Sequence, residues 1–320
     1  MISVLLTTYN SAPYIKDSIY SILNQTYKGF EFVIIDDGST DNTENIITGI
    51  RDSRIRYYKI EHVGRSKALN YGLKICNCDW VALIDADDIA HPRRLEMQYS
   101  KDLVFNNIVV VSCVYFWENR LLYKIDVNNL KFPKDFILHQ KFPNSVLYNR
   151  RFILRNGGYN DSLNVAEDYD LWLRIMSKAD FRVVNDILMF YRQTPNALSR
   201  KNEVTTNSTI YKIQEKYYHY LNYYFGINNI REQNIYRGWR EYFFGNPKLA
   251  QKFWLKKISS LINLRIFLAF FLTFLPQKYI NDFKKMRIKL KLKFIFDKLL
   301  GNNKKIQIIF DETLKTIKNY

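Results

Sequence analysis

The sequence is poor in the residues that build disulfide or zinc frameworks. It has three cysteines and four histidines in 320 residues. Cys76 and Cys78 form a Cys-Asn-Cys pair with no histidine at metal-ligand spacing, and Cys113 stands apart, so neither a disulfide framework nor a zinc site is expected. Reduced core thiols in a cytosolic protein fit better. The histidines are scattered, and we expect each to be structural.

Long hydrophobic runs are also scarce. The most apolar segment, Ile258–Pro276, is interrupted by Asn263 and Arg265. Its clean part, Ile266–Leu275, has about ten residues, whereas a helix needs about 20 to span a bilayer. A transmembrane helix is therefore not expected. The start, MISVLLTTYN, has no basic residue and soon turns polar, which favours a first strand over a signal peptide.

Acidic residues are in deficit, and the deficit is local. The chain has 31 Asp and Glu against 48 Lys and Arg, and residues 201–320 hold 23 of the basic residues but only 8 of the acidic ones. Within that region, Lys278–Lys305 alternates cations with apolar residues, a pattern typical of binding to an anionic membrane surface. Two alternatives stay open: a helical hairpin packed on the rest of the protein, and a nucleic-acid-binding surface, which the abundant tyrosines would also suit.

What the first 90 residues do contain is a regular alternation of short apolar runs and helix-like segments. With 47% apolar residues the chain can build a sizeable core. The alternation predicts βαβ units, and hence a parallel sheet covered by helices on both faces. The expected strands are Ser3–Leu6, Phe30–Ile35, Arg56–Ile60 and Trp80–Ile84, and the expected helices are Ala12–Gln25, Thr43–Arg51 and Ser66–Lys74. Further along, we expect a helix from His91, a strand at Val109–Val114, and helices from Ala166 and Val204.

Polar residues follow three of the expected strands. The first strand leads into Thr7-Thr8-Tyr9-Asn10, the second into Asp36-Asp37-Gly38-Ser39, and the fourth into Asp85-Ala86-Asp87-Asp88. Ligands of such sheets bind beyond the carboxyl ends of the strands, so these residues predict a binding site there. Taken alone, the second segment is also an ordinary turn before an N-capped helix.

The acids Asp85, Asp87 and Asp88 repel one another and need a positive partner. Mn²⁺ or Mg²⁺ would serve, since either binds one or two carboxylates and keeps waters and phosphates as its other ligands. Such a cation would also stabilise a diphosphate leaving group. Arg65, at the head of a helix, offers a phosphate-sized positive patch, or else is an exposed cap residue.

A base that activates an attacking hydroxyl must lie apart from the cation. Asp168 is our candidate, and its neighbour Glu167 is the rival. Both fall in the first turn of the helix expected from Ala166, where acids also complement the helix dipole.

Six segments in fixed order carry a resemblance to a known family. They are SVLLTTYN, EFVIIDDGSTDNT, GRSKALNYGL, WVALIDADDIAHPRRLEMQ, GGYNDSLNVAEDYDLWLRI and FYR. Over residues 1 to 200 the chain resembles the family 2 glycosyltransferases, inverting enzymes of the GT-A fold. The resemblance implies an α/β nucleotide-diphospho-sugar transferase fold, with a mostly parallel sheet flanked by helices. It divides the chain into a catalytic domain, 1–200, with a nucleotide-binding half (1–90) and an acceptor half (91–200), and a helical, basic, membrane-associating region, 201–320.

The resemblance also implies roles for the residues at the strand ends. Thr7 and Tyr9 would hold the nucleotide base, and Asp37 or its neighbour Asp36 would bond the base edge. Arg65 would approach the ribose or diphosphate.

The remaining roles concern the metal and the base. Asp85 and Asp87 fit the family's Asp-x-Asp metal motif, and Asp88 fits the variant in which the second acid of an Asp-Asp pair binds the metal. Asp168 would deprotonate the acceptor hydroxyl, and one in-line displacement would invert the anomeric carbon.

The expected function follows from these roles. It is transfer of a sugar from a nucleotide sugar, a UDP-sugar, to a saccharide or lipid-linked acceptor in capsule, O-antigen or exopolysaccharide biosynthesis, by a cytoplasmic protein peripheral at the inner face of the cell membrane. A nucleotidyltransferase is disfavoured because no Gly-rich loop follows the first strand. The chain could instead be a nucleic-acid-binding protein or a catalytically inactive sugar-binding relative.

Overall fold

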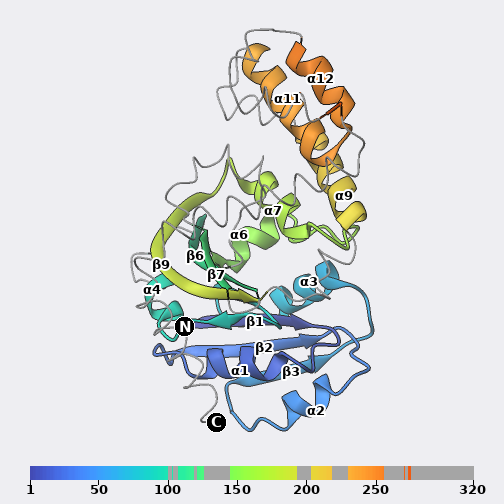
Figure 1. The fold of residues 1–320 in the computed structure, drawn as a ribbon. Coiled ribbons are helices and arrows are strands. Elements are labelled where there is room, and N and C mark those ends of the chain that lie inside the picture. The colour runs from blue at the N-terminus through green and yellow to red at the C-terminus, as the bar shows by residue number, and fades with distance from the viewer. Residues whose placement is uncertain are drawn as a thin grey trace. The chain divides into compact units, whose positions relative to one another are not determined.

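The computed structural model describes residues 1–99, 103, 107–118, 121–125, 145–192, 203–217, 230–255, 270 and 273–274. These residues belong to two compact units, one containing the described residues up to 192 and the other those from 203 onward. Figure 1 shows the elements of both units, and each unit is described by itself.

The first unit begins with four parallel strands in the order β3-β2-β1-β4. The strands are β1 (Ile2–Thr8), β2 (Phe30–Asp36), β3 (Ile55–Lys59) and β4 (Trp80–Asp85), and the helices between them are α1 (Ile15–Leu23), α2 (Thr43–Thr48) and α3 (Arg65–Ile75). All seven elements predicted for this half are present, so the parallel α/β prediction is confirmed here. The helices α1 and α2 are shorter than predicted, because α1 begins three residues later and ends at Leu23, and α2 ends at Thr48 ahead of Gly49.

Alternation along β1 sends side chains to both faces of the sheet. Val4 and Leu6 join the core that contains Ile19 of α1. Leu5 points to the other face, where a Cβ on Gly72 of α3 would lie 2.4 Å from its Cδ1. The helix α3 can therefore pack closely on the sheet only because residue 72 has no side chain.

Beyond β4 the sheet becomes mixed. The added elements are β5 (Ile89–Ala90), α4 (Arg94–Gln98), β6 (Ile108–Glu118), β7 (Leu121–Ile125), β8 (Val146–Asn149), α6 (Arg150–Arg155), α7 (Glu167–Ile175) and β9 (Asp180–Arg192). The full order of the described strands is β3-β2-β1-β4-β8-β6-β9-β5, with β7 paired to β6. Only β6 pairs in parallel in this half, with β9, whereas the β4–β8, β5–β9, β6–β7 and β6–β8 pairs are antiparallel.

The sequence pattern predicted one of these later strands, β6, and missed the others. β8 has four residues, too few to show alternation, and β9 mixes exposed and buried positions without a strict period. The helix expected from His91 is the five-residue α4, and the helix expected from Ala166 begins one residue later as α7.

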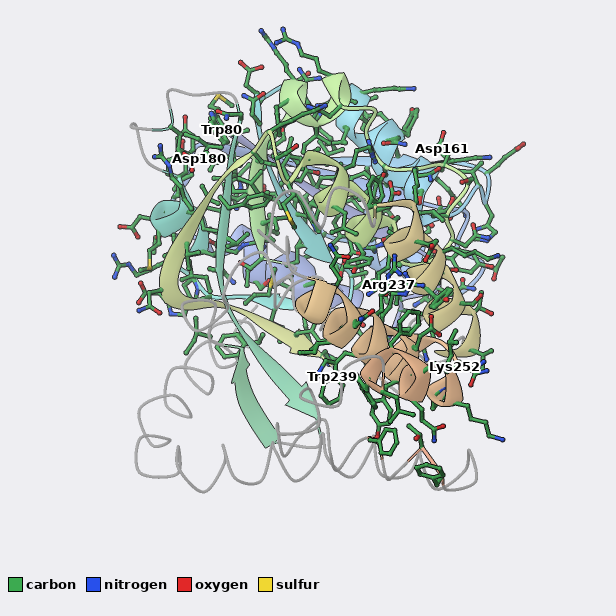
Figure 2. All side chains as sticks on the ribbon, turned by 90° about the horizontal axis from the view of Figure 1, so that it is seen from above. Trp80, Asp161, Asp180, Arg237, Trp239 and Lys252 are labelled. Carbon is green, nitrogen blue, oxygen red and sulfur yellow. The ribbon has the colours of Figure 1, made fainter. Side chains whose placement is uncertain are left out.

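The described part of the second unit is helical, as predicted for the region from Val204. It contains α9 (Glu203–Lys216), α11 (Ile230–Phe244) and α12 (Pro247–Leu255), with α11 packed on both others. Trp239 and Tyr242 of α11 surround Trp254 of α12, with ring centroids 5.2 and 5.9 Å from that of Trp254. Figure 2 labels Trp239 on α11 and Lys252 on α12.

The basic and apolar segments singled out in the C-terminal region lie almost wholly outside the described residues. Of Ile258–Pro276 only Phe270, Thr273 and Phe274 are described, and of Lys278–Lys305 nothing is. Within the described part of the chain, no helix has the length and apolar character that crossing a membrane requires.

Candidate active site

The predicted site residues gather at the carboxyl ends of β1, β2 and β4. The register of these parallel strands places Thr7 beside Asp85 and Thr8 beside Asp36. Tyr9 and Asp37 follow directly in the adjoining loops. One edge of the sheet therefore carries the residues expected for both the nucleotide base and the cation.

The acid turn, Asp85–Asp88, closes the end of β4, with the Asp88 N–H donating to the Asp85 carbonyl at 3.1 Å. Asp88 is fully buried. Its Oδ1 accepts the Arg192 N–H at 3.1 Å, while its Oδ2 is buried and has no hydrogen-bond partner among the described residues. A buried carboxylate oxygen without a partner is costly, so this oxygen is suited to a ligand.

Burial and mutual repulsion raise the pKa values of two acids in this turn. The pKa of Asp87 rises to about 6 through burial and the charge of Asp85. The pKa of Asp88 is also raised, by burial first and then by the charges of Asp87 and Asp85. Both shifts have the cause expected of buried carboxylates that lie close to one another.

Three arginines supply positive charge near the acid turn, where the sequence predicted a positive partner. Arg65 donates from Nη2 to Asp85 Oδ1 at 2.5 Å. Arg192 donates from Nε to the Asp87 carbonyl at 3.0 Å. Arg94 is fully buried and donates from Nη2 to the Leu83 carbonyl on β4 at 2.6 Å. Burial lowers the pKa of Arg94 to about 10, and the charges of Asp88 and Asp85 act in the opposite direction.

Arg65 also reaches the first turn of α7. Its Nε donates to Glu167 Oε1 at 2.6 Å, so one guanidinium joins the end of β4 to the start of α7. The side chain of Arg65 is 30% exposed and that of Glu167 is 7% exposed. Arg65 heads α3 as predicted, but it is not merely an exposed cap residue, since two carboxylates hold it.

Asp168, the candidate base, follows Glu167 and remains partly exposed. Its Oδ1 accepts the N–H of Tyr169 at 2.7 Å. Burial and the neighbouring charge of Glu167 raise its pKa to about 7. A carboxylate with such a pKa can exchange protons near neutral pH, whereas Glu167, committed to Arg65, is the weaker candidate.

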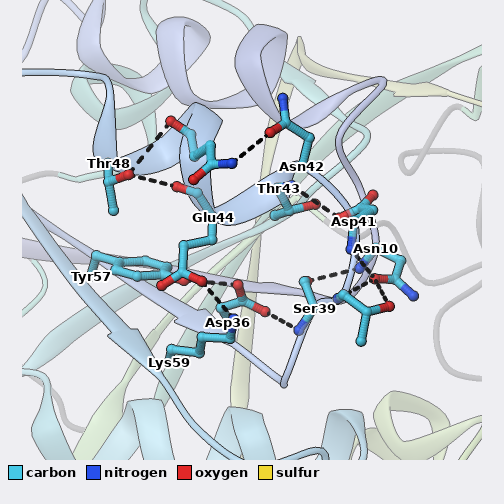
Figure 3. A network of polar contacts seen from close by, with 12 residues as sticks. Asn10, Asp36, Ser39, Asp41, Asn42, Thr43, Glu44, Thr48, Tyr57 and Lys59 are labelled. Carbon is cyan, nitrogen blue, oxygen red and sulfur yellow. Dashed lines mark hydrogen bonds and ion pairs between the residues drawn. The ribbon is translucent and has the colours of Figure 1, made fainter.

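The structure separates the two aspartates at the end of β2. Asp36 is fully buried, and its carboxylate accepts the N–H of Ser39 at 2.7 Å and the hydroxyl of Tyr57 at 2.8 Å. These bonds belong to a network, drawn in Figure 3, in which Asn10 also binds the Ser39 hydroxyl. Asp36 therefore stiffens the loops around the site rather than facing a ligand.

Asp37 lies on the other side of the same strand end. Its Oδ1 accepts the N–H of Val63 at 2.8 Å, and its Oδ2 accepts that of Gly64 at 3.0 Å. His62 of the same loop lies 3.0 Å from Asp37 Oδ2 through Nδ1 and stacks on Tyr9, with ring centroids 4.2 Å apart. Tyr9 is 45% exposed, so an aromatic surface borders the site.

Sequence reasoning missed His62, Arg94 and Arg192 as members of this site. A scattered histidine gives no pattern signal, and His62 is recognised only by its contacts with Tyr9 and Asp37. Arg94 and Arg192 can be assigned to the site only after the structure shows which groups lie next to them. Placed together, these residues form an aromatic border, an acid turn and a candidate base at one edge of the sheet.

The acid turn fits a divalent cation of the Mn²⁺ or Mg²⁺ type. Among the described residues, no group of three or more histidine, cysteine, aspartate or glutamate side chains is arranged to enclose a metal ion. These cations do not need such a cage, because one or two carboxylates suffice where phosphates and waters complete the shell. The Oδ2 of Asp88, which has no hydrogen-bond partner among the described residues, and the partly exposed Asp87 beside it match that requirement.

A helix-covered α/β sheet with acids, a candidate base and an aromatic rim at its strand ends defines a class of group-transfer enzyme. The sequence profile of the family "Glycosyl transferase family 2" matches residues 3–159. Relatives of this chain include the O-antigen biosynthesis glycosyltransferase WbnJ of Escherichia coli, which is 32% identical over 56% of this chain and 72% of the relative. The chain belongs to glycosyl transferase family 2 and is a glycosyltransferase.

Another glycosyltransferase relative and a solved structure are also similar to this chain. The UDP-Glc:alpha-D-GlcNAc-diphosphoundecaprenol beta-1,3-glucosyltransferase WfgD of Escherichia coli is 31% identical over 62% of this chain and 79% of the relative. The crystal structure of S. aureus TarS 1-349 in complex with UDP-GlcNAc has a TM-score of 0.54 and 17% identity, covering 81% of this chain and 72% of that one. This likeness shows the GT-A fold. Matches to three Rickettsia glycosyltransferases span 69% of one relative and 39% of two longer ones.

Proposed function

We propose that this glycosyltransferase uses a UDP-sugar and a divalent cation to glycosylate a hydroxyl of a saccharide or lipid-linked acceptor, with inversion at the anomeric carbon. The observation that carries the proposal is the pair of ion pairs made by Arg65. Through them one guanidinium joins the acid turn to the first turn of α7, which carries Asp168. Leaving-group stabilisation and proton removal, the two tasks of the reaction, then fall on different elements of one site.

In this reaction Asp168 accepts the proton of the acceptor hydroxyl while the hydroxyl oxygen attacks the anomeric carbon. The bond between that carbon and the diphosphate oxygen breaks, and its electron pair leaves with the nucleoside diphosphate. A single displacement inverts the configuration. A divalent cation held by Asp88 and Asp87 would neutralise the charge that develops on the diphosphate.

The nucleotide end of the donor would lie over Tyr9, with Thr7 and Asp37 beneath it. Tyr9 offers an exposed ring face for stacking on a base. The backbone amides of Val63 and Gly64 hold Asp37 in place beside that ring, so its carboxylate presents a fixed acceptor edge. A UDP-sugar is favoured because the relative WfgD is named as a UDP-Glc glucosyltransferase and the similar TarS structure is a complex with UDP-GlcNAc.

The donor can be identified with the purified chain alone. Each of a panel of UDP-, GDP- and dTDP-sugars is added with Mn²⁺ or with EDTA, and thermal stabilisation and release of the nucleoside diphosphate are measured. We expect UDP-sugars to stabilise the protein and to be hydrolysed slowly, both only with the cation. Equal stabilisation in EDTA would remove the cation from the proposal, and stabilisation by another nucleotide class would replace the donor.

We place the reaction in bacterial surface-polysaccharide assembly, at the inner face of the cell membrane. Two relatives bear names from O-antigen biosynthesis and from a diphosphoundecaprenol acceptor. The basic excess of residues 201–320 would draw the enzyme to anionic lipid beside such an acceptor. Full-length protein should co-sediment with anionic vesicles at physiological salt and not with neutral ones. Failure to do so, or preferential retention on single-stranded nucleic acid, would overturn this part.

A further inference from the structure

Arg192 ends β9 and lies against the acid turn, although 104 positions separate it from Asp88. The strand register explains the approach. β9 runs antiparallel to β5, with Ile89 opposite Phe190, so continuing the pairing brings Arg192 level with Asp87. A residue far away in sequence thus reaches the turn through sheet topology alone.

The hydrogen bonds of Arg192 at the turn include bonds to three different groups. Its backbone N–H donates to Asp88 Oδ1 at 3.1 Å, its Nε to the Asp87 carbonyl at 3.0 Å, and its Nη2 to Asp17 Oδ2 on α1 at 2.8 Å. The guanidinium also lies 5.0 Å from the ring centre of Tyr14. With only 15% of the side chain exposed, these contacts fix its direction.

The helix α1 holds the same turn from the other side. Ser18, next to Asp17, is buried, and its hydroxyl donates to the Asp85 carbonyl at 3.1 Å and to the Asp88 carbonyl. Together Ser18 and Arg192 bind the carbonyls of residues 85, 87 and 88. The backbone of the turn is therefore fastened to the protein through three of its carbonyls.

We propose that Arg192 is a positioning residue for the acid turn. Its side chain, oriented by Asp17, holds the Asp87 carbonyl and so sets the position of the Asp88 Oδ2, which has no hydrogen-bond partner among the described residues and would bind a divalent cation. Arg192 acts through Asp88 and does not touch the sugar nucleotide. This inference rests on the proposed function, because it takes the acid turn to be the cation site.

The test compares four variants and a matched control. Arg192→Met removes the donors and keeps the length, Arg192→Lys keeps the charge, and Asp17→Ala removes the outer partner; the fourth variant combines Arg192→Met with Asp17→Ala. Arg182→Met is the control, since Arg182 lies on the same strand, pairs with Asp180 at 3.3 Å and has a side chain that is 41% exposed. For each protein we would measure Mn²⁺ affinity with UDP present by electron paramagnetic resonance, UDP affinity in EDTA, and the melting temperature.

We expect Arg192→Met to weaken Mn²⁺ binding by about tenfold or more, the usual effect of losing an outer-shell partner. UDP affinity in EDTA and the melting temperature should stay close to those of the unchanged protein. Arg192→Lys should recover part of the loss, because an ammonium can reach one of the two acceptors. Asp17→Ala should weaken Mn²⁺ binding less, and the double variant should match Arg192→Met, because Asp17 acts only through Arg192. Arg182→Met should change nothing.

Several outcomes would overturn the inference. Unchanged Mn²⁺ affinity in Arg192→Met, or additive losses in the double variant, would remove the positioning role. A fall in UDP affinity in EDTA would make Arg192 a nucleotide contact. A lowered melting temperature that lysine restores without restoring Mn²⁺ affinity would make its role structural. If the unchanged protein bound no Mn²⁺ in the presence of UDP, the divalent cation of the proposed function would be refuted. If the unchanged protein binds Mn²⁺ and Arg192→Met binds it equally well, only the positioning role of Arg192 is refuted.

Discussion

Arg65 and Glu167 form an ion pair of 2.6 Å across 102 positions of sequence. The contact fixes the start of α7, where Asp168 follows Glu167, against the site that begins at the end of β4. It also places a second negative charge beside Asp168, and that charge is one reason for the raised pKa of Asp168. The pair thus influences both the position and the proton affinity of the candidate base.

Replacing Glu167 by glutamine should move the pH dependence of the reaction. Burial and the charge of Glu167 raise the Asp168 pKa to about 7, and a base must be ionised to accept a proton. The rate of donor turnover should therefore fall below about pH 7 in the unchanged enzyme. Removing the charge favours ionised Asp168, so the acid limb of kcat/KM should shift to lower pH in Glu167→Gln.

The control for that shift is Glu96→Gln, which removes an exposed acid of α4 that pairs with Arg93. Its pH profile should match that of the unchanged enzyme. An acid limb that stays in place in Glu167→Gln, or moves to higher pH, would show that another group sets it.

Asp168→Asn should lower turnover by about a thousandfold, within the range that positioned proton transfer contributes. Asparagine has nearly the same shape but cannot accept the proton. Nucleotide-sugar binding, measured by calorimetry with Mn²⁺, should change little, because Asp168 lies apart from the acid turn. Comparable losses of binding and turnover would mean that Asp168 holds the donor, and Glu167 would then be the next candidate base.

Gly72→Ala should destabilise the first unit. The added Cβ would meet Leu5 Cδ1 at 2.4 Å and Ile35 Cγ1 at 3.2 Å, both in the packed core. Overpacking of this kind costs about 1–3 kcal/mol, measurable as a lower free energy of unfolding in urea. Gly29→Ala is the matched control, since its Cβ would meet only the end of the Tyr27 side chain at 3.0 Å. Equal stability of the two variants would show that α3 can shift away from the sheet.

The sequence could predict where the site lies because strand ends are local features. Apolar runs mark β1, β2 and β4, and parallel strands bring the residues that follow them to one edge. The sequence left Asp36 and Asp37 as alternatives, because a strand that is buried on both faces shows no alternation. The structure separates them through their partners, since Tyr57 binds Asp36 and the loop amides of Val63 and Gly64 bind Asp37.

The partners of the acids could not be predicted in the same way. Arg192 meets Asp17 across 175 positions, and that contact depends on β9 lying beside β5, an order that no local pattern records. Whether Asp85 faces a cation or Arg65 depends on the side-chain directions at the end of β4 and at the start of α3. The sequence indicated that positive charge was needed at the carboxyl ends of the strands. Which arginine pairs with which acid depends on how the elements pack.

Replacing Asp85 and Asp88 one at a time should show which of these two acids binds the cation. Asp85 is paired with Arg65 at 2.5 Å, whereas Asp88 keeps a buried oxygen without a partner among the described residues. Asp88→Asn should therefore raise the Mn²⁺ concentration needed for half-maximal turnover by more than about tenfold, because a charged ligand oxygen is lost. Asp85→Asn should leave that concentration closer to normal and lower kcat instead, because Arg65 and α7 lose their anchor. Melting temperatures of both variants check that they fold. If Asp85→Asn shifts the Mn²⁺ requirement as much as Asp88→Asn does, then Asp85 is itself a cation ligand and releases Arg65 when the donor binds.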